Sequence, residues 1–566
     1  MAQKRWSVAR RAPADHIGAF AGLDPLLVQL LINRGITTLE EAHSFLAVDE
    51  RLTYDPMLLD DMDVAIGRLR KALNRREPVA VYGDFDVDGI TSTVLLAQAL
   101  RTLGAVSVTP YIPHRLDEGY GLNCRALRSL HEQGIRLVVT VDCGTNSDRE
   151  IAFARSLGMD VIITDHHSTS GACRTALATI NPMRPDSRYP FRELAGVGVA
   201  FKVAQALFSE YSSADWSEQE SSLLDLVALG TVADLAPLIC ENRYLVHRGL
   251  VALNRTARPG LREMALCAGV RLGSLNTSTI GYVLGPRLNA AGRLDDAIVS
   301  YNLLSTKSAT EAADLASILE TQNQERQRLT SEAILRAKEQ VGPTAPEAPV
   351  LIISGKAYPQ GIVGLVAGRL AEEFYRPALV IDQGEEECRG SARSIPEFNI
   401  IAALQQCSDL LVRFGGHAQA AGFTVRAERL DEFRHRLTEL AIQELRDKDL
   451  CPTLTIDAEV ALGELNHNAY QTIQRLAPFG YGNPTPTFLS RGVKLIESRV
   501  VGSQGNHLRL KLHDGRTIWP GIAFRQASAL DRPVSSVDIV YSLDVNEWNG
   551  NQYLQLRIKD LRPAEA

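Results

Sequence analysis

Three aspartates at alternate positions are the feature of the sequence that most directly suggests chemistry. The segment 82–89, YGDFDVDG, carries Asp84, Asp86 and Asp88 directly after a short apolar run. Clustered carboxylates repel one another and raise each other's pKa unless a cation lies among them. Hard divalent cations take oxygen ligands, and an added imidazole nitrogen shifts the preference toward manganese and similar metals. The segment therefore predicts a divalent metal site.

Acidic and imidazole side chains also end three later apolar runs. They are Asp142 (run 135–142), the tripeptide Asp165-His166-His167 (run 159–165) and Asp234 (a helix-like run). Neighbouring side chains on a strand point to opposite faces, so at most one histidine faces the site unless the chain bends. A helix-capping aspartate and a pair of buried structural histidines are the ordinary alternatives. Four such sites together are better explained by one metal centre.

Two other structures fit part of the 84–89 pattern. Asp-x-Asp-x-Asp-Gly resembles the start of a calcium loop, but no glutamate stands at the twelfth position, and a strand precedes the motif where a helix is required. A solvated turn is the second alternative. Neither accounts for the later sites, so we favour a catalytic metal centre.

The elements that must position these residues alternate between short strands and helices. Buried strands are expected at 78–84, 135–142 and 159–165, with helices at 90–104 and 147–158 between them. This alternation predicts a parallel, doubly wound α/β sheet. Ligands bind beyond the carboxyl ends of the strands in such sheets. The acidic side chains stand at those ends, where a catalytic site is expected.

The sequence pattern changes twice in the second half of the chain. The stretch 308–341 contains neither Gly nor Pro and predicts one long helix, stopped by the Pro-rich segment 342–349. A smaller α/β unit is expected after it, and from about 452 short alternating strands predict an antiparallel β domain of the OB type. We expect five parts: an N-terminal helical segment (1–50), a catalytic α/β domain (51–305), the connecting long helix (306–345), a smaller α/β domain (346–450) and an OB-like nucleic-acid-binding domain (451–566).

Composition narrows the class of protein. At 566 residues, with 45% hydrophobic and 22% charged, the chain is long enough for three or four globular domains. No run approaches 18 apolar residues and the N-terminus lacks a secretory apolar core, so no membrane association is expected. Eight scattered cysteines without a Cys-x-x-Cys pair argue against disulfide frameworks and zinc ribbons and favour a cytoplasmic protein. The net charge of −7 does not indicate nucleic-acid binding, although it allows a locally basic channel.

The ordered motifs resemble those of the DHH phosphoesterase family, and in particular its RecJ-type exonucleases. GDFDVDG, VDCG, TDHH and VAD match the four DHH motifs in order. The likeness to RecJ-type enzymes extends through GYG (119–121), LAGVGVAFK (194–202), GPRLNAAGRLDD (285–296), GSARSI (390–395), GGHAQAAGF (415–423) and PFGYGNPTPTF (478–488). This resemblance implies DHH, DHHA1 and OB-like domains and a metal-dependent exodeoxyribonuclease. Such an enzyme degrades single-stranded DNA from 5′ to 3′, releases 5′ mononucleotides, and acts in DNA recombination and repair.

The resemblance also implies the residues of the catalytic centre. Two manganese ions, with magnesium as a substitute, would be held by Asp84, Asp86, Asp88, Asp142, His166 and Asp234. Catalytic roles fall to Asp88, to His167, which would face the scissile phosphate, and to Asp165, which would accept a hydrogen bond from a liganding imidazole. Two cations would activate a water and neutralise the charge that builds on the phosphate.

Phosphate-binding residues are expected around this centre, because arginine grips phosphate with two donors and glycine lets backbone N–H groups approach it. They are Arg115, Arg287, Asn289, Arg293, Ser391, Arg393, Gly415, Gly416 and His417. A surface ion pair is the ordinary alternative for each arginine. In the C-terminal domain, contacts to single strands are expected among Phe479, Tyr481, Phe488, His507, Arg509, Lys511, Phe524 and Arg525. Burial in the core is the alternative for these aromatic residues.

The implied substrate is single-stranded DNA with an accessible 5′ end, acted on by a monomer. Single-strand-binding protein and a RecQ-type helicase are the implied partners. The alternative function is a phosphodiesterase of short oligonucleotides or cyclic dinucleotides, which the terminal β domain disfavours. A catalytically dead scaffold is disfavoured by the complete set of carboxylates. Two departures from the family pattern leave local roles open: Tyr358-Pro359 where Trp-His is expected, and Cys143 where Asn is expected.

Overall fold

The structure, a computed structural model, consists of two compact units. One unit is Thr53–Leu450, and the other joins the N-terminal residues through Leu52 to Cys451–Ala566. The described residues are 4–115, 117–169, 175–211, 215–342, 347–502, 505–527, 529–530, 534–548 and 551–564. Residues 343–346 of the expected Pro-rich break therefore lie outside the described residues. Among these residues, no helix combines the length and hydropathy needed to span a bilayer.

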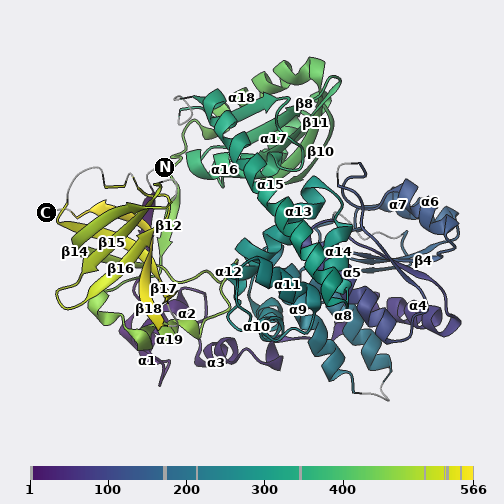
Figure 1. Cartoon of the computed structure of the whole chain (residues 1–566), viewed down its shortest axis with the longest axis horizontal. Helices are drawn as coiled ribbons and strands as arrows, with labels where there is room; N and C mark the ends of the chain where they lie inside the picture. Colours follow the sequence, from purple (N-terminus) through teal and green to yellow (C-terminus); the bar gives the residue numbers. More distant parts are fainter. Residues whose placement is uncertain are drawn as a thin grey trace. The chain divides into compact units, whose positions relative to one another are not determined.

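A five-stranded parallel sheet forms the centre of the first unit, which confirms the predicted α/β class. The strand order is β3-β2-β4-β5-β6 and every neighbouring pair is parallel. Figure 1 labels β4 of this sheet. The strands are β2 (Val79–Tyr82), β3 (Val108–Tyr111), β4 (Leu137–Val141), β5 (Asp160–Thr164) and β6 (Ala178–Ile180). The register aligns β2 with residues 137–140 of β4, and β4 with all of β5. The residues that follow these three strands therefore meet at one edge of the sheet.

Helices cover both faces of this sheet because side chains alternate along each strand. Val79 and Val81 pack into a core with α4, α5, α8 and α9, whereas Ala80 and Tyr82 pack under α6 and α7. The helices of this part are α4 (Met62–Arg75), α5 (Val87–Thr102), α6 (Cys124–Glu132), α7 (Asp148–Ser156), α8 (Gly196–Glu210), α9 (Ser217–Ala233), α10 (Cys240–Asn254), α11 (Pro259–Cys267), α12 (Thr277–Thr279), the π-helical turn η3 (Ile280–Leu284), α13 (Gly285–Leu294) and α14 (Ile298–Ser305).

The predicted long helix is confirmed as α15 (Ala309–Val341). Its 33 residues span about 50 Å at 1.5 Å per residue. Ser308 caps its first turn by accepting a hydrogen bond from the Glu311 amide. Buried residues recur at helical spacing along one side, at Ala312, Ala316, Leu319 and Asn323, and then at Ala333 and Ala337. The first group packs with α11 and α13 and the last two with the smaller sheet, so the helix links both parts of this unit.

The smaller sheet of the first unit has the order β10-β11-β9-β8-β7, and within it β7 and β8 are parallel and the other pairs antiparallel. One face packs on α17 and α18 and the other on α16. The elements are β7 (Leu351–Gly355), α16 (Val363–Phe374), β8 (Ala378–Gln383), β9 (Glu387–Arg393), α17 (Ile400–Gln406), β10 (Leu411–His417), β11 (Ala420–Arg426) and α18 (Leu430–Leu445).

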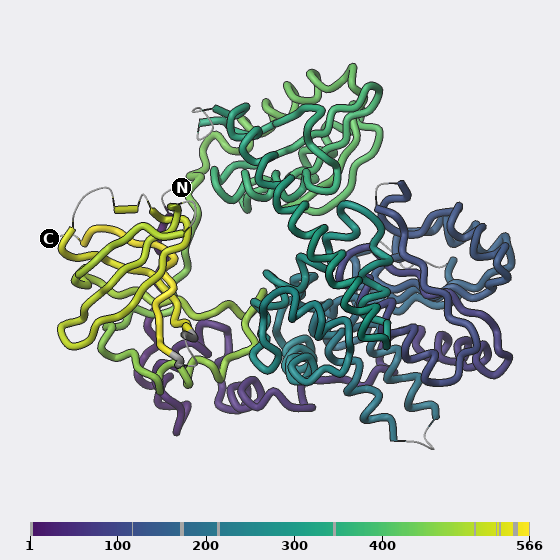
Figure 2. The backbone as a smooth tube through the Cα atoms, viewed as in Figure 1, coloured from purple at the N-terminus to yellow at the C-terminus, as the bar shows by residue number. Residues whose placement is uncertain are grey.

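The second unit contains a closed five-stranded barrel, as the expected OB-like domain requires. The strands follow the order β14-β15-β16-β18-β17, and β17 pairs back onto β14. In Figure 2 the chain of this barrel is coloured yellow-green to yellow. This closure and the parallel β16–β18 pair are the topology of an OB fold. The barrel strands are β14 (Phe488–Val501), β15 (His507–His513), β16 (Ile518–Ala523), β17 (Ser536–Trp548) and β18 (Asn551–Pro563).

The N-terminal segment packs against this barrel. Its strand β1 (Arg5–Val8) pairs in parallel with β12 (Thr453–Ile456). Leu27, Leu30 and Leu31 of α2 are fully buried and share one core with the inward side chains of the barrel. The remaining elements are α1 (Ala14–Gly18), α2 (Pro25–Ile32), α3 (Leu39–Ala47), β13 (Ala458–Glu459) and α19 (His467–Gln474).

Candidate metal centre and phosphate-binding residues

The loop between β2 and α5 presents the three predicted aspartates. Asp86 caps α5, because its carboxylate accepts hydrogen bonds from the amides of Asp88 and Gly89. A Cβ added to Gly89 would lie 2.5 Å from the Asp84 nitrogen, so only glycine lets the two backbone segments approach this closely. The tight turn buries Asp84 and Asp88 and leaves Asp86 partly exposed.

Backbone amides of α8 hold Asp88 in place. Its two carboxylate oxygens accept hydrogen bonds from Gly196 at 2.7 Å and from Val197 at 2.8 Å. These amides begin α8, where free N–H groups and the helix dipole favour an anion. The same helix end packs against Asp142, since a Cβ on Gly196 would lie 2.7 Å from the Asp142 Cβ. The start of α8 therefore positions the carboxylates of both Asp88 and Asp142. The pattern of the segment 194–202 had not by itself suggested this role.

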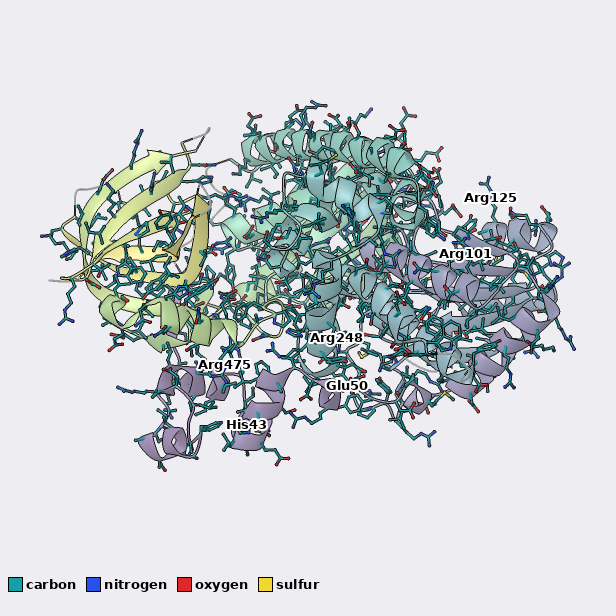
Figure 3. All side chains as sticks on the ribbon, turned by 60° about the horizontal axis from the view of Figure 1, so that its bottom comes forward. His43, Glu50, Arg101, Arg125, Arg248 and Arg475 are labelled. Carbon is teal, nitrogen blue, oxygen red and sulfur yellow. The ribbon has the colours of Figure 1, made fainter. Side chains whose placement is uncertain are left out.

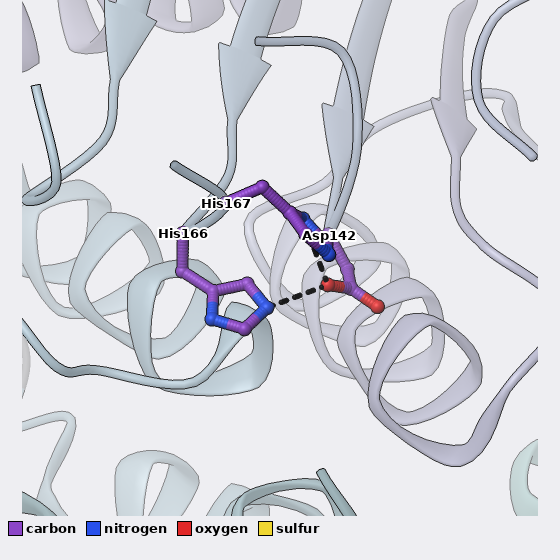
Figure 4. Close-up of side chains that lie close together, drawn as sticks. All are labelled: Asp142, His166 and His167. Atoms are coloured by element: carbon purple, nitrogen blue, oxygen red, sulfur yellow. Dashed lines mark hydrogen bonds and ion pairs between the residues drawn. The ribbon is translucent and has the colours of Figure 1, made fainter. Parts of the chain in front are cut away.

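Both histidines face Asp142, because the chain has left strand β5 before it reaches them. His166 Nε2 lies 3.0 Å and His167 Nδ1 3.9 Å from Asp142 Oδ1 (Figure 4). The two rings are 4.6 Å apart. Asp142 itself has a φ of 60°, a conformation that aspartate tolerates better than most residues. The bend that the sequence left open is therefore present.

Asp165 is fully buried and organises the histidine pair. Its carboxylate accepts hydrogen bonds from the amides of His166 and Thr145 and from His167 Nδ1, the last at 2.7 Å. Burial alone would raise the pKa of Asp165, but the hydrogen bond and charge of His167 lower it below its usual value. The imidazole that donates to Asp165 is that of His167, and the ring of His166 is turned toward Asp142.

The predicted ligands come together in space. Asp234 ends α9 as its C-cap, and its Oδ2 lies 3.9 Å from His166 Nδ1. Ligand atoms of Asp84, Asp86 and Asp142 lie within 4.8 Å of one another, as do those of Asp88, His166 and Asp234, and those of Asp142, His166 and His167. The sheet edge thus holds five carboxylates and two imidazoles in one cluster. His167 belongs to it as well as the six predicted ligands.

Such a concentration of buried acid is unusual, because charged side chains normally lie on the outer surface, as Arg125 of α6 does (Figure 3). Burial first, and then repulsion between carboxylates, raises the pKa values of Asp84 and Asp142. The pKa of Asp88 reaches about 6 and that of Asp234 about 7, also mainly through burial. A divalent cation would remove this penalty.

An unpartnered carboxylate oxygen is a second observation that fits a divalent metal ion at this site. Within the described part of the chain, the buried Oδ1 of Asp84 has no hydrogen-bond partner. A buried oxygen without a partner is a destabilising feature unless a ligand completes the site. Carboxylate oxygens combined with imidazole nitrogen suit manganese and also allow magnesium.

Three of the predicted phosphate-binding arginines lie beside one another. Arg115 stacks over Phe85, with its Cζ 4.7 Å from the ring centroid. Arg293 donates to the Gly361 carbonyl, and Arg393 donates to Ser391 Oγ. Burial, followed by the positive charges of Arg115, Arg326 and Arg393, lowers the pKa of Arg293 to about 9. Mutually repelling arginines would be stabilised by a bound anion.

The register of the smaller sheet aligns the remaining predicted residues. Ser391 lies opposite Gly422, which lies opposite Gly415, while Arg393 lies opposite Ala420, which lies opposite His417. Directly opposed residues of antiparallel strands share a face. The serine, arginine, glycine and histidine of this sheet therefore lie on the face that carries α16. Gly416 has a φ of 143°, and a Cβ added there would lie 2.3 Å from the Ala420 carbonyl oxygen, so the backbone requires glycine at this position.

Other predicted or questioned positions have ordinary structural surroundings. Arg287 forms an ion pair with Glu320 at 2.6 Å, the alternative noted above for surface arginines. Asn289 lies one helical turn from Arg293 on α13 and is partly exposed. Tyr358 is buried beside α15 and α16, so the departure from the family pattern fills a core position. Cys143 is also buried, with its Sγ 3.8 Å from the Tyr82 carbonyl oxygen.

Phe488 and Tyr120 lie in surroundings that differ from what the sequence analysis expected. Phe488 is fully buried in the barrel core, so the prediction that it contacts a base is wrong. Tyr120 had no predicted role, yet its hydroxyl lies 3.0 Å from His167 Nδ1 and its ring packs edge-on against that imidazole. The 119–121 motif was visible in the sequence, but only the folded loop brings it to the histidine.

The outer face of the barrel carries basic and aromatic side chains. Pairing aligns Arg499 with Arg509, Arg509 with Ile522, and Ile522 with Arg557 across four strands. Phe524 is exposed, with His507 edge-on to its ring and the Arg557 guanidinium 5.5 Å from the ring centroid. Lys511 pairs with Glu497. Tyr481 and Arg525 are exposed, whereas Phe479 packs partly into the core.

Three family models match the chain in this order. They are the DHH family N-terminal domain over residues 78–231, the DHHA1 domain over residues 347–443 and the RecJ OB domain over residues 456–560.

Similar proteins match over nearly the whole chain. The single-stranded-DNA-specific exonuclease RecJ of Bacillus subtilis is 37% identical, covering 99% of this chain and 71% of the relative. The RecJ of Escherichia coli is 35% identical and 96% of each chain is covered. The crystal structure of RecJ from Thermus thermophilus in complex with Mn²⁺ has a TM-score of 0.84 and 29% identity, covering 99% of this chain and 80% of that one. The Mg²⁺ complex of the same protein has a TM-score of 0.79.

Proposed function

The chain belongs to the RecJ family of single-stranded-DNA-specific exonucleases, and we propose that it degrades single-stranded DNA from the 5′ end, releasing 5′ mononucleotides at a centre of two divalent cations. The observation that carries the proposal is the cluster of five carboxylates and two imidazoles at the sheet edge, together with Arg115, Arg293 and Arg393, whose positive charges act on one another. We assign the ions to Asp84, Asp86, Asp88, Asp142, His166 and Asp234. Ions bound there would lower the pKa of the attacking water and would neutralise the negative charge on the phosphate.

The side chains around this centre have distinct tasks in the proposal. Asp165 receives the Nδ1–H of His167, which leaves Nε2 directed away from Asp165 and available to a phosphate oxygen. Burial opposes protonation of His167, but the hydrogen bond to Asp165 outweighs it and raises the pKa to about 9. A protonated His167 would stabilise negative charge on the phosphate. Asp88, held by two amides, keeps its carboxylate aimed at the cluster.

Phosphates at the 5′ end of the strand would lie against the arginines. Arg115, Arg293 and Arg393 offer guanidinium groups, and Ser391 and the exposed Gly415 offer a hydroxyl and open backbone on the same face. Arg287, Asn289, Gly416 and His417 remain proposed substrate contacts of the same region.

The barrel would bind the strand in a way that does not depend on sequence. Its arginine row, with Phe524, combines cations for phosphates and a ring for base stacking. Family membership further supports single-strand-binding protein and a RecQ-type helicase as partners in recombination and repair, with the enzyme acting as a cytoplasmic monomer.

Two matched oligonucleotides test the proposal. Purified protein with manganese is given one strand with a free 5′ end and one with that end blocked. We expect stepwise release of 5′ mononucleotides from the free-end strand alone. Asp86→Ala should abolish this release, whereas Asp63→Ala, which alters an exposed aspartate of α4, should not. Cleavage of dinucleotides without digestion of either strand would overturn the proposal.

A further inference from the structure

Asn181 is a buried amide at the carboxyl end of β6, a strand that was not predicted from the sequence. The strand pairs in parallel with β5, with Ile180 opposite Thr164, and the Asp165 amide donates to the Ile180 carbonyl. Pro182 follows Asn181, and a residue before proline is restricted to extended conformations. Asn181 therefore lies beside Asp165, with its backbone direction fixed by its own neighbours.

The side chain of Asn181 engages both of its N–H groups and its oxygen. Its Nδ2 donates to the His167 carbonyl oxygen and to Thr145 Oγ1, each at 2.9 Å, and its Oδ1 accepts from the Met183 amide at 2.7 Å. A buried amide bonded in this way is held in one orientation. None of the three partners is among the six proposed metal ligands, so the contacts of Asn181 serve the histidine rather than the ions.

Thr145 joins Asn181 to the imidazole of His167. The Thr145 backbone amide donates to Asp165 Oδ2 at 2.9 Å, and Oδ1 of the same carboxylate accepts from His167 Nδ1 at 2.7 Å. Asn181 thus reaches His167 twice, directly at the main-chain carbonyl and, through Thr145 and Asp165, at the ring. A closed set of hydrogen bonds of this kind fixes both the backbone and the side chain of the histidine.

His167 depends on such support because it lies beyond the end of β5. The strand ends at Thr164, and the His167 side chain is 42% exposed. The next carbonyl, that of Ser168, accepts a hydrogen bond from Asn146 at 3.1 Å, but Asn146 is exposed. A buried hydrogen bond is the more costly to lose, because water cannot replace the missing partner. Asn181 therefore supplies the buried restraint on the His167 carbonyl.

We propose that Asn181 is a positioning residue, which holds His167 in the orientation in which its Nε2 faces the phosphate. The inference rests on the proposed role of His167 and deepens it. Without the amide, the His167 carbonyl loses its buried donor and Thr145 loses its link to the histidine, whereas the proposed metal ligands keep the contacts described above. Displacing a catalytic group by about 1 Å can cost about 100-fold in rate. The loss should therefore affect the chemical step and spare the binding of metal and substrate.

The test measures kcat and KM on a single strand with a free 5′ end, and manganese affinity by titration calorimetry. Asn181→Ala should lower kcat about 10- to 100-fold and leave KM and manganese affinity unchanged. Asn254→Ala is the matched control, because the Asn254 amide also donates to two backbone carbonyls, those of Leu250 and Leu275. It should lower the melting temperature and leave kcat at the wild-type value.

A double-mutant cycle tests whether Asn181 acts through His167. In single turnovers with excess enzyme, Asn181→Ala should cause no further loss of rate in a His167→Asn background, because the group that it positions is already gone. Thr145→Val removes the hydroxyl that Asn181 contacts and should also lower kcat, while Thr145→Ser should restore it. The two Thr145 variants decide the question if Asn181→Ala does not fold.

The outcomes separate this inference from the proposed function. The positioning role would be refuted by an unchanged kcat in Asn181→Ala, by a fall in manganese affinity that accompanies the loss of kcat, or by an equal loss of rate with and without the His167 imidazole. Each of these results leaves the exonuclease assignment intact, provided that the wild-type protein releases 5′ mononucleotides. A wild-type protein that digests no single strand would overturn the proposed function itself, and this inference with it.

Discussion

The carboxylate cluster predicts that one substitution stabilises the metal-free protein and weakens its response to metal. Asp234→Asn keeps the size of the side chain and removes one of the mutually repelling charges. Burial and the neighbouring Asp88 raise the pKa of Asp234 from 3.8 to about 7. Each pKa unit corresponds to about 1.4 kcal/mol, so ionising this carboxyl in the metal-free fold costs up to about 4 kcal/mol. The Asp234 side chain is 27% exposed, so solvent screening places the expected gain below this upper limit.

The direction of the pH dependence follows from the raised pKa. An acid whose pKa is higher in the folded state contributes stability below its unfolded pKa, here about 4, and loses that contribution as the pH rises through 7. In EDTA, the melting temperatures of wild type and Asp234→Asn should therefore be similar near pH 4. They should diverge through pH 7, with the variant melting higher at pH 8.

Calorimetry at pH 8 with and without manganese completes the assay. Manganese should raise the melting temperature of the wild type more than that of the variant, because a bound ion stabilises the fold according to its affinity. A variant that melts lower than wild type in EDTA at pH 8 would refute the electrostatic reasoning. Equal stabilisation of both proteins by manganese would refute the assignment of Asp234 as a ligand.

Two further predictions concern the surroundings of the substrate and the metals. Gly196→Ala should weaken manganese binding, measured by titration calorimetry, because its new Cβ would displace Asp142. The control is Gly198→Ala, which should bind manganese normally because its Cβ would meet the flexible Leu194 side chain at 3.3 Å. Arg509→Gln and Arg557→Gln should each weaken single-strand binding and reduce the slope of log affinity against log salt by about 0.7, and an unchanged slope would contradict a phosphate contact.

The sequence alone determined the parts of this protein that depend on local pattern. Alternating apolar strands and helices predicted a parallel sheet, and parallel strands deliver their carboxyl ends to one edge, so Asp84, Asp142 and Asp165 had to gather. The absence of Gly and Pro over 308–341 predicted α15 for an equally local reason. Phe488 was misassigned because an aromatic residue in a strand has the same pattern whether it faces the core or the solvent.

Only the tertiary structure decided which groups touch. The bend after β5 turns both histidines toward Asp142, and it is His167 that donates a hydrogen bond to Asp165. The direction of the backbone there depends on contacts with Thr145 and Asn181, which are distant in sequence. The partner of an arginine is set by packing between helices: Arg287 meets Glu320, whereas Arg326, in a helix full of acids, meets none among the described residues. The association of the N-terminal helices with the barrel joins residues more than 400 positions apart. Long-range burial determines such contacts, and no local pattern carries them.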